Sequence, residues 1–242
     1  MLDLTKIRAI SLDLDDTLWP IWPTIARAEQ VLLAWLQEHA PTTAAMFASP
    51  EALRDIRNQI QSVRPDLHSD LSAMRRESIR VALHRAGDDS LLADEAFEVF
   101  FAERQKVDLF DDVLPALEHL AARFPLVALT NGNADIGRVG LSAYFKASIS
   151  AREFGVGKPD PRIFVAAAGA CGVMPAEVLH VGDDALLDVL GALNADMQAV
   201  WVNRTDQLWM QEQQPHAEIA SLAELSAMFQ GAGSPEAVSD RL

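Results

Sequence analysis

The sequence predicts an α/β protein, a Rossmann-like open parallel sheet with an inserted four-helix bundle. Short apolar runs without clean alternation, each followed by a polar, glycine-bearing or acidic turn, are typical of strands buried on both faces. Helical segments lie between the later runs, and this alternation favours a parallel sheet with right-handed crossovers. The long stretch between the first run and the second carries helical periodicity and no strand pattern.

Four apolar runs are the expected strands of the sheet, at residues 7–14, 126–129, 178–181 and 199–202. Residues 147–150 are a weaker candidate, either for a strand at the edge of the sheet or for the start of the next loop. Helices are expected between the later strands, at residues 113–123, 161–171 and 185–194. The second of them has two start signals, because Asp160 can cap its first turn and Pro161 occupies its first helical position.

Four amphipathic helices are expected between the first strand and the second. Apolar residues recur at spacings of three and four within residues 25–35 and 53–63, and two more helices are expected at 71–86 and around 97–101. Gly87 gives the third of them a good C-cap. Four such helices can close a small bundle. We therefore expect a core formed by residues 1–18 and 108–230, a helical domain at 19–107 and a flexible tail at 231–242.

Composition and charge disfavour several classes of protein. Of the 242 residues, 50% are hydrophobic and 23% are charged, which is typical of a globular chain. Lys and Arg number 20 against 35 Asp and Glu, and the net charge of -15 disfavours nucleic acid or an anionic membrane as a partner. The single cysteine, Cys171, forms no internal disulfide, and no apolar run reaches the roughly 18 residues that span a bilayer. The sequence therefore predicts a cytoplasmic protein.

The first expected strand ends in a cluster of acidic residues, Asp13-Leu14-Asp15-Asp16-Thr17. Ligands of open α/β sheets bind beyond the carboxyl ends of the strands, which is where this cluster falls. Asp13 and Asp15 lie on one side of an extended chain and repel each other, so the pair favours a divalent cation. Mg²⁺ is the expected ion because it prefers oxygen ligands. Acidic residues that only terminate a strand are the alternative interpretation.

Three further segments fit phosphate and metal chemistry. Thr130-Asn131-Gly132 follows the second strand, where a hydroxyl and backbone N–H groups can hold phosphate oxygens. Lys158 lies in a stiff loop that opens a helix, so its ammonium could neutralise phosphate, although a lone loop lysine is often solvated. Gly182-Asp183-Asp184 ends another strand and precedes Asp188, and these carboxylates could complete a metal site. Asp184 alternatively only caps the helix that follows.

The four segments, which occur in this order at separate strand ends or loops, resemble the motifs of the haloacid dehalogenase (HAD) superfamily. The helical insertion after the first motif resembles the helical (C1-type) cap of that superfamily. The resemblance implies an HAD-like core, a cap at residues 19–107 and hydrolysis of a small-molecule phosphate ester with Mg²⁺ as cofactor.

The resemblance also implies a role for each matched residue. Asp13 would attack phosphorus and form an aspartyl-phosphate, while Asp15 would act as general acid and then as general base. Thr130, Asn131 and Lys158 would hold the phosphoryl oxygens. The implied metal ligands are the Asp13 carboxylate, the Asp15 backbone carbonyl and Asp183, with support from Asp184 and Asp188.

Three other interpretations stay open. The 2-haloacid dehalogenases of the superfamily need the first aspartate but not the acid that this chain has at Asp15. An alkoxide leaving group needs that acid and a halide does not, so a phosphatase is favoured over a dehalogenase. Phosphomutases share all four motifs. A non-catalytic HAD-fold binding protein is disfavoured because the chain keeps the residues that such a relative would lose, Asp13, Asp15, Lys158 and Asp183.

The cap is expected to choose the substrate, because it closes over a core that recognises only phosphate and metal. Arg75 and Arg76 on the third expected cap helix are candidate specificity residues, with a solvated helix face as the alternative. Trp19 and Trp22 follow the first motif and are expected to pack at the hinge, with stacking on a flat ligand as the alternative. His180 is expected to be an ordinary buried core residue. The sequence indicates no oligomeric state.

At the level of the whole chain, the sequence resembles bacterial HAD phosphatases that act on flavin-pathway compounds. Stretches that extend beyond the minimal motifs carry this resemblance, at residues 12–18, 128–134 and 179–184, and the cap length is similar. The substrates that it implies are 5-amino-6-(5-phospho-D-ribitylamino)uracil and FMN.

Overall fold

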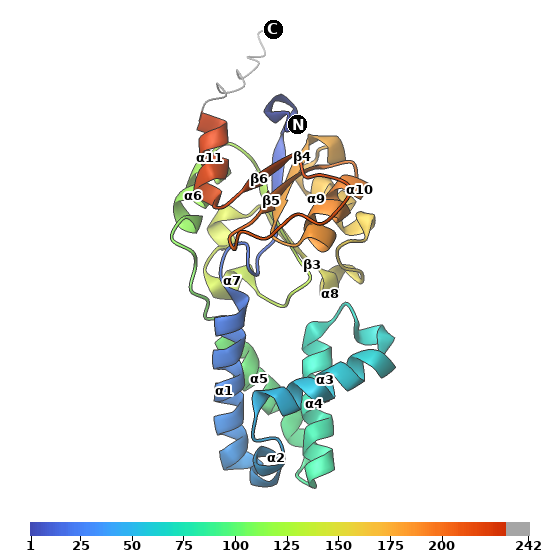
Figure 1. Ribbon diagram of the computed structural model, residues 1–242. Helices are drawn as coiled ribbons and strands as arrows, with labels where there is room; N and C mark the ends of the chain where they lie inside the picture. Colours follow the sequence, from blue (N-terminus) through green and yellow to red (C-terminus); the bar gives the residue numbers. More distant parts are fainter. Residues whose placement is uncertain (231–242) are drawn as a thin grey trace.

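The computed structural model describes residues 1–230, which form an α/β lobe and a helical lobe (Figure 1). The sheet has six strands in the order β3-β2-β1-β4-β5-β6, and every neighbouring pair is parallel. The predicted open parallel sheet is therefore confirmed. The strands are β1 (Ala9–Leu12), β2 (Leu126–Thr130), β3 (Ala147–Ser150), β4 (Val178–Gly182), β5 (Gln198–Val202) and β6 (Ala217–Ile219). The tail expected at 231–242 lies outside the described residues.

The first strand lies inside the sheet between β2 and β4, and it is shorter than the sequence suggests. Its last residue, Leu12, pairs with Ala128 of β2 and with Val181 of β4. The chain then enters a tight loop, in which Asp16 has a φ of 59° and donates its backbone N–H to the Trp19 carbonyl at 2.8 Å. This loop places the acidic cluster beyond the carboxyl end of β1, at the carboxyl edge of the sheet.

The two outer strands differ in how well the sequence predicts them. The weak candidate at 147–150 is β3, which pairs with β2 and forms one edge of the sheet. The sequence analysis does not predict β6 at the other edge. This strand has three residues, of which only Ile219 is buried, so it leaves no apolar run to detect.

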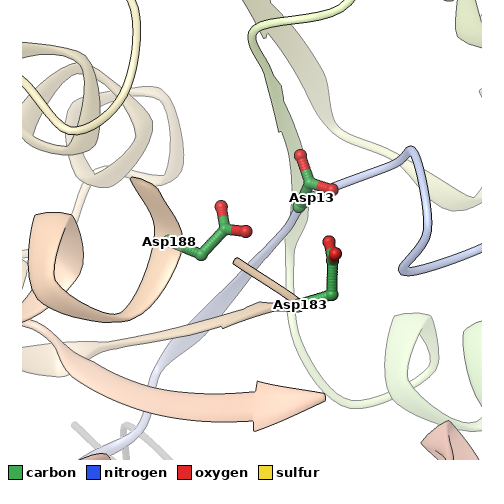
Figure 2. A group of neighbouring side chains, drawn as sticks. All are labelled: Asp13, Asp183 and Asp188. Atoms are coloured by element: carbon green, nitrogen blue, oxygen red, sulfur yellow. The ribbon is translucent and has the colours of Figure 1, made fainter. Parts of the chain in front are cut away.

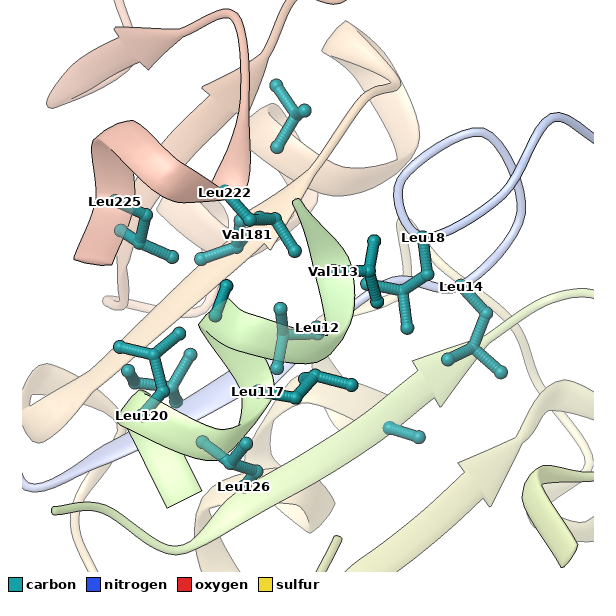
Figure 3. Close-up of a cluster of buried hydrophobic side chains, with 14 of the residues drawn as sticks. Leu12, Leu14, Leu18, Val113, Leu117, Leu120, Leu126, Val181, Leu222 and Leu225 are labelled. Carbon is teal, nitrogen blue, oxygen red and sulfur yellow. The ribbon is translucent and has the colours of Figure 1, made fainter. Parts of the chain in front are cut away.

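Helices cover both faces of the sheet. On one face, α6 (Val113–Ala121) and α11 (Leu222–Gln230) pack on side chains that include Leu12, Leu126 and Val181 (Figure 3). On the other face, α9 (Pro161–Cys171) and α10 (Gly191–Asn194) pack on the alternate residues of the same strands. Burial on both faces explains why the strands read as continuous apolar runs. Two short helices follow the strands on one side of β1, namely α7 (Ile136–Val139) and α8 (Ala151–Phe154).

The helix expected at 185–194 begins with π-helical geometry. Residues Ala185–Leu190 form the π-helical segment, and α10 continues from it. π-Helical turns are rare and occur frequently at functional sites. This one carries Asp188, whose side chain is buried. Five 3₁₀ turns complete the described structure, at Leu4–Lys6, Pro65–Leu67, Ser90–Leu92, Ser142–Tyr144 and Pro175–Glu177.

Five α-helices form the second lobe, where the sequence analysis predicts four. The unpredicted helix is α2, whose six residues are too few to show a period. The helices bury an apolar cluster of their own, which includes Leu32, Ile56, Ile79 and Phe97. They are α1 (Ile21–His39), α2 (Pro41–Met46), α3 (Pro50–Val63), α4 (Leu71–Ala86) and α5 (Ala93–Arg104).

The helical lobe faces the carboxyl ends of the strands (Figure 1). It follows β1 directly, and the chain returns from α5 to α6 of the α/β lobe. The domain boundaries at residues 18 and 108 stay a prediction. Across residues 1–230, no helix combines the length and apolar character needed to cross a membrane.

Candidate active site

Three carboxylates from different segments converge at the carboxyl edge of the sheet. Asp13 follows β1, Asp183 follows β4, and Asp188 comes from the π-helical segment. One oxygen of each carboxylate lies within 4.8 Å of an oxygen of the other two. Figure 2 shows the three side chains directed toward one another. The neighbouring positions of β1 and β4 in the sheet explain why residues 170 positions apart in the chain meet here.

Lys158 joins two of these carboxylates. Its Nζ donates to Asp13 Oδ1 at 2.5 Å and to Asp188 Oδ1 at 2.5 Å, and the side chain is buried. Asp188 also accepts from His180, whose Nε2 lies 3.1 Å from the same Oδ1, and Ser11 Oγ lies 2.8 Å from His180 Nδ1. His180 is therefore a fully bonded buried residue as expected, but its partner is a carboxylate of the site.

Burial and charge shift the protonation of this cluster in opposite directions. Burial raises the pKa of Asp13 well above its ordinary value, against the pull of the Lys158 ammonium. Burial would also raise the pKa of Asp188, yet Lys158 and His180 hold it below its ordinary value. Although burial opposes the charge of Lys158, the two carboxylates raise its pKa. Lys158 is thus held as an ammonium and Asp188 as a carboxylate.

The third carboxylate, Asp183, has no cationic partner within residues 1–230. Burial and the nearby Asp188 and Asp16 carboxylates raise the pKa of Asp183 to about 7. Its one hydrogen bond from a side chain comes from Thr17 Oγ1, at 3.2 Å, among the described residues. Three carboxylates around a single ammonium, two of them buried, favour a bound cation, and oxygen-only donors suit Mg²⁺. The residues present therefore fit a divalent metal ion.

Asp15 points to a different set of partners. Its carboxylate accepts from Arg104 Nη2 at 2.7 and 2.8 Å and from Trp19 Nε1 at 2.8 Å. Arg104 ends α5 of the helical lobe and is almost fully buried. Its Nη1 has no hydrogen-bond partner in the described part of the chain. The sequence does not single out Arg104, because nothing in the spacing of α5 distinguishes it from any charged residue at a helix end.

The phosphate-binding residues predicted at the end of β2 include one that contacts Lys158, namely Asn131. Thr130 is buried, and its Oγ1 accepts from the Gly132 N–H at 2.8 Å. The Asn131 side chain donates to the Lys158 carbonyl at 2.8 Å and accepts from the Lys158 N–H at 2.7 Å. Two hydrogen bonds to one backbone residue hold the loop of Lys158 against the end of β2. The side chain of Asn131 thus positions Lys158, which its sequence context does not predict.

Asp184 and Asp188 have different surroundings. Asp184 caps the π-helical segment, since its Oδ1 accepts from the backbone N–H groups of Leu186 and Leu187 at 2.8 Å. Its backbone N–H donates to Asp188 Oδ2 at 3.0 Å. The structure therefore brings Asp188 into the carboxylate cluster and places the Asp184 side chain in a capping bond.

Cavities between the two lobes open toward this site. One of 610 Å³ is lined by Asn131, Gly157 and Lys158 of the α/β lobe and by Leu71 and His68 of the helical lobe. A second, of 440 Å³, is lined by Gly132 and Asn133 together with Ser72 and Phe101. A third, of 270 Å³, lies among α3, α4 and α5. The site is therefore reached from a cleft that both lobes line.

The two arginines predicted to select the substrate lie in different places. Arg75 is buried and lines the 270 Å³ cavity. Arg76 instead pairs with Asp94 at 2.9 Å and lies over the Phe97 ring, and it lines none of the three cavities described above.

The two tryptophans after the first motif also differ. Trp19 is fully buried and belongs to the apolar cluster of the sheet, consistent with the expected packing role. Trp22 is 63% exposed, and the guanidinium of Arg54 lies 5.8 Å from its ring.

Comparison with known proteins identifies the family. The haloacid dehalogenase-like hydrolase family matches residues 7–196. The chain belongs to this family.

Relatives refine the class. The chain is 34% identical over 234 residues to the 5-amino-6-(5-phospho-D-ribitylamino)uracil phosphatase YigB of Escherichia coli, covering 93% of this chain and 98% of that one. It is 37% identical over 157 residues to a phosphoserine phosphatase of Thermus thermophilus, covering 62% and 63%. A crystal structure titled 2-haloacid dehalogenase, from Pseudomonas syringae pv. Tomato, superposes with a TM-score of 0.86 at 40% identity and covers 94% of this chain and 100% of that one. With its phosphatase relatives, the chain is a phosphoric monoester hydrolase.

Gly182 tests whether the end of β4 determines the position of Asp188. A Cβ on Gly182 would lie 2.5 Å from Asp188 Oδ2, so the Gly182→Ala variant must displace the carboxylate that binds Lys158. We expect this variant to lose about 1–3 kcal/mol of unfolding free energy, measured by urea denaturation.

Gly169→Ala is the matched control for this prediction. Gly169 lies on α9, where an added Cβ meets no atom within 4 Å. Alanine at this position should be neutral or stabilising by up to about 1 kcal/mol. Equal stability of the two variants would contradict the tight packing of Gly182 on Asp188.

Proposed function

We propose that the chain is a Mg²⁺-dependent phosphatase of a small phosphorylated metabolite and that it acts through an aspartyl-phosphate on Asp13. The observation that carries the proposal is the pairing of Asp13 with the buried Lys158 ammonium beside Asp183 and Asp188. A carboxylate beside a lysine that lines the cleft is a suitable nucleophile, and the ammonium of that lysine can receive phosphoryl oxygens.

In the first step, a carboxylate oxygen of Asp13 forms a bond to phosphorus as the bond from phosphorus to the substrate oxygen breaks. Asp15 donates its proton to that oxygen, which leaves as an alcohol. The Thr130 hydroxyl, the Asn131 backbone N–H and the Lys158 ammonium hold the phosphoryl oxygens. Asp13, the Asp15 carbonyl and Asp183 would hold Mg²⁺, with support from Asp184 and Asp188. The bound ion would supply the positive charge that lets an anionic nucleophile approach an anionic substrate.

In the second step, water attacks phosphorus and the Asp13–phosphorus bond breaks, which releases phosphate and restores the Asp13 carboxylate. Asp15, now a carboxylate, accepts the proton of that water. Arg104 and Trp19 hold Asp15 at 2.7 and 2.8 Å, so they fix the orientation of the group that moves the proton. The helical lobe at residues 19–107 serves as a cap, because one of its residues directly contacts the proposed acid.

We propose 5-amino-6-(5-phospho-D-ribitylamino)uracil or FMN as the substrate. The similarity to the phosphatase of Escherichia coli that is named for the first compound supports this, since it extends over 93% of this chain, cap included. Small phosphate esters of this kind also fit a site that both lobes enclose.

The similarity to a structure titled 2-haloacid dehalogenase favours C–halogen hydrolysis as a second candidate function. That reaction also needs an aspartate nucleophile, but its halide leaves without a proton. The bonds that Arg104 and Trp19 make to Asp15 would then serve no purpose in the chemistry. The phosphomutase alternative differs only in the fate of the phosphoryl group, which passes back to the substrate. The intact Asp13, Lys158 and Asp183 continue to disfavour a non-catalytic binding protein.

The proposed function is tested by phosphate release from FMN, 5-amino-6-(5-phospho-D-ribitylamino)uracil and glycerol 3-phosphate. We expect release that needs Mg²⁺, stops with a chelator and falls by roughly 10³-fold or more in Asp13→Asn. Asp89→Asn, in an exposed turn of the cap, is the control and should keep full activity. Activity of Asp13→Asn close to that of the wild type would exclude the covalent mechanism.

The role of Asp15 is tested by varying the leaving group. Asp15→Asn keeps the size of the side chain but cannot donate the proton, so hydrolysis of FMN should fall by about 10²-fold or more. Hydrolysis of p-nitrophenyl phosphate, whose leaving group needs no proton, should fall much less.

Two results would contradict this role. One is an equal loss of activity on both esters. The other is release of chloride from 2-chloropropionate by the wild type and by Asp15→Asn alike, which would instead support the dehalogenase.

A further inference from the structure

The 270 Å³ cavity of the helical lobe concentrates positive charge in an otherwise acidic protein. Its lining includes Arg57 and Gln61 of α3, Arg75 of α4 and Phe100 of α5. The chain as a whole carries a net charge of -15, so guanidinium groups gathered at one cavity need a physical reason.

One buried carboxylate partly balances these arginines. Glu29 of α1 is 1% exposed and accepts from Arg54 Nη2 at 2.6 Å and from Arg75 Nη1 at 3.2 Å. Arg57 forms no hydrogen bond or ion pair with any side chain that the structure describes, and only longer-range attraction links it to Glu29. Arg54 and Arg75 both bond to Glu29, whereas Arg57, which lines the cavity beside Arg75, bonds to no side chain in the described part of the chain.

Burial makes this excess of positive charge costly. Burial lowers the pKa of Arg57. Burial and the nearby positive charge of Arg57 lower the pKa of Arg75 to about 10. Arg75 is further fixed by stacking on Phe100, with its guanidinium carbon 4.2 Å from the ring centre. A ligand that accepts hydrogen bonds would relieve this cost, because charge-assisted hydrogen bonds are about twice as strong as neutral ones.

The cavity adjoins the proposed reaction centre on two sides. Leu71 lines both this cavity and the 610 Å³ cavity that contains Lys158. Asn133, which follows the Thr130 turn, lines both this cavity and the 440 Å³ cavity that contains Gly132. A substrate whose phosphate lies at Asp13 can therefore extend its other end into the cap.

The lining defines the chemistry of that other end. Leu71 and Phe100 offer apolar surfaces, Arg57 and Arg75 offer N–H donors, and the side-chain amides of Gln61 and Asn133 can both donate and accept. The volume of 270 Å³ lies just below the range for whole-ligand pockets, which begins at about 300 Å³. It suits one end of a metabolite, with flat apolar faces and polar atoms confined to an edge.

We propose that this cavity is the head-group site of the cap and that it binds a planar heterocycle through carbonyl oxygens on its edge. Arg57 and Arg75 donate to the carbonyl oxygens, and Gln61 or Asn133 accepts the ring N–H that lies between them. This inference rests on the proposed function and deepens it, since the pyrimidinedione edge is common to 5-amino-6-(5-phospho-D-ribitylamino)uracil and FMN.

Arg57→Met tests the proposal with little risk to folding, because the residue is half-buried and bonds to no side chain among the described residues. We expect kcat/KM for FMN to fall about tenfold to a hundredfold, and kcat/KM for glycerol 3-phosphate, which has no ring, to change less than twofold. Arg85→Met is the control. Arg85 lies exposed on α4, bonds to Gln59 and lines none of the three cavities, so its loss should change neither value.

Binding of riboflavin gives a readout independent of turnover. Riboflavin carries the heterocycle without the phosphate, and quenching of its fluorescence measures binding to the protein without metal. We expect Arg57→Met to weaken this binding tenfold or more and Arg85→Met to leave it unchanged.

Three results would overturn the head-group site. The first is an equal loss of activity on FMN and on glycerol 3-phosphate, and the second is unchanged riboflavin binding. The third is a larger loss on phosphoserine than on FMN, which would assign the cavity to a carboxylate. Activity of the wild type distinguishes failure of the head-group site from failure of the proposed function. If the wild type releases phosphate from none of the esters, the proposed phosphatase function is itself contradicted.

Discussion

Two buried carboxylates share one ammonium at the carboxyl edge of the sheet, and the site is arranged around that interaction. Lys158 Nζ lies 2.5 Å from both Asp13 and Asp188, so removing the lysine would leave two carboxylates buried together. Breaking a buried ion pair in this way costs about 3–5 kcal/mol. The same ammonium faces the cleft through which a phosphate would approach, so a group that stabilises the fold is also placed to neutralise substrate charge.

The fold brings the residues of this interaction and their neighbours together from separate segments of the chain. The adjacent strands β1 and β4 bring Asp13 and Asp183 together, and the π-helical segment turns Asp188 toward them. Asn131 at the end of β2 holds the Lys158 loop through two backbone hydrogen bonds. Arg104 extends the arrangement into the helical lobe, since its bond to Asp15 joins the end of α5 to the loop after β1. The cap and the core therefore meet at the group that is proposed to transfer the proton.

Residue patterns predict the parts of this protein that depend on local sequence. Burial on both faces makes the strands continuous apolar runs, and their order with the intervening helices gives the parallel sheet. Four short motifs at strand ends or loops predict Asp13, Lys158 and Asp183. Other features depend on contacts between distant segments. Arg104 acquires its role from Asp15, a partner 89 positions away. The π-helical segment that carries Asp188 has only six residues and shows no sequence periodicity that would predict it. The short elements α2 and β6 are missed because too few residues carry their pattern.

The central claim is that Asp13 carries the phosphoryl group during turnover. The most direct measurement is an acid quench of the Mg²⁺-loaded enzyme during its first turnover of ³²P-labelled FMN, followed by peptide mapping of the labelled protein. The account predicts an alkali-labile phosphate on the peptide that contains Asp13 and none on the Asp13→Asn protein. Release of labelled phosphate without any label on the protein, or label mapped to a different residue, would contradict it.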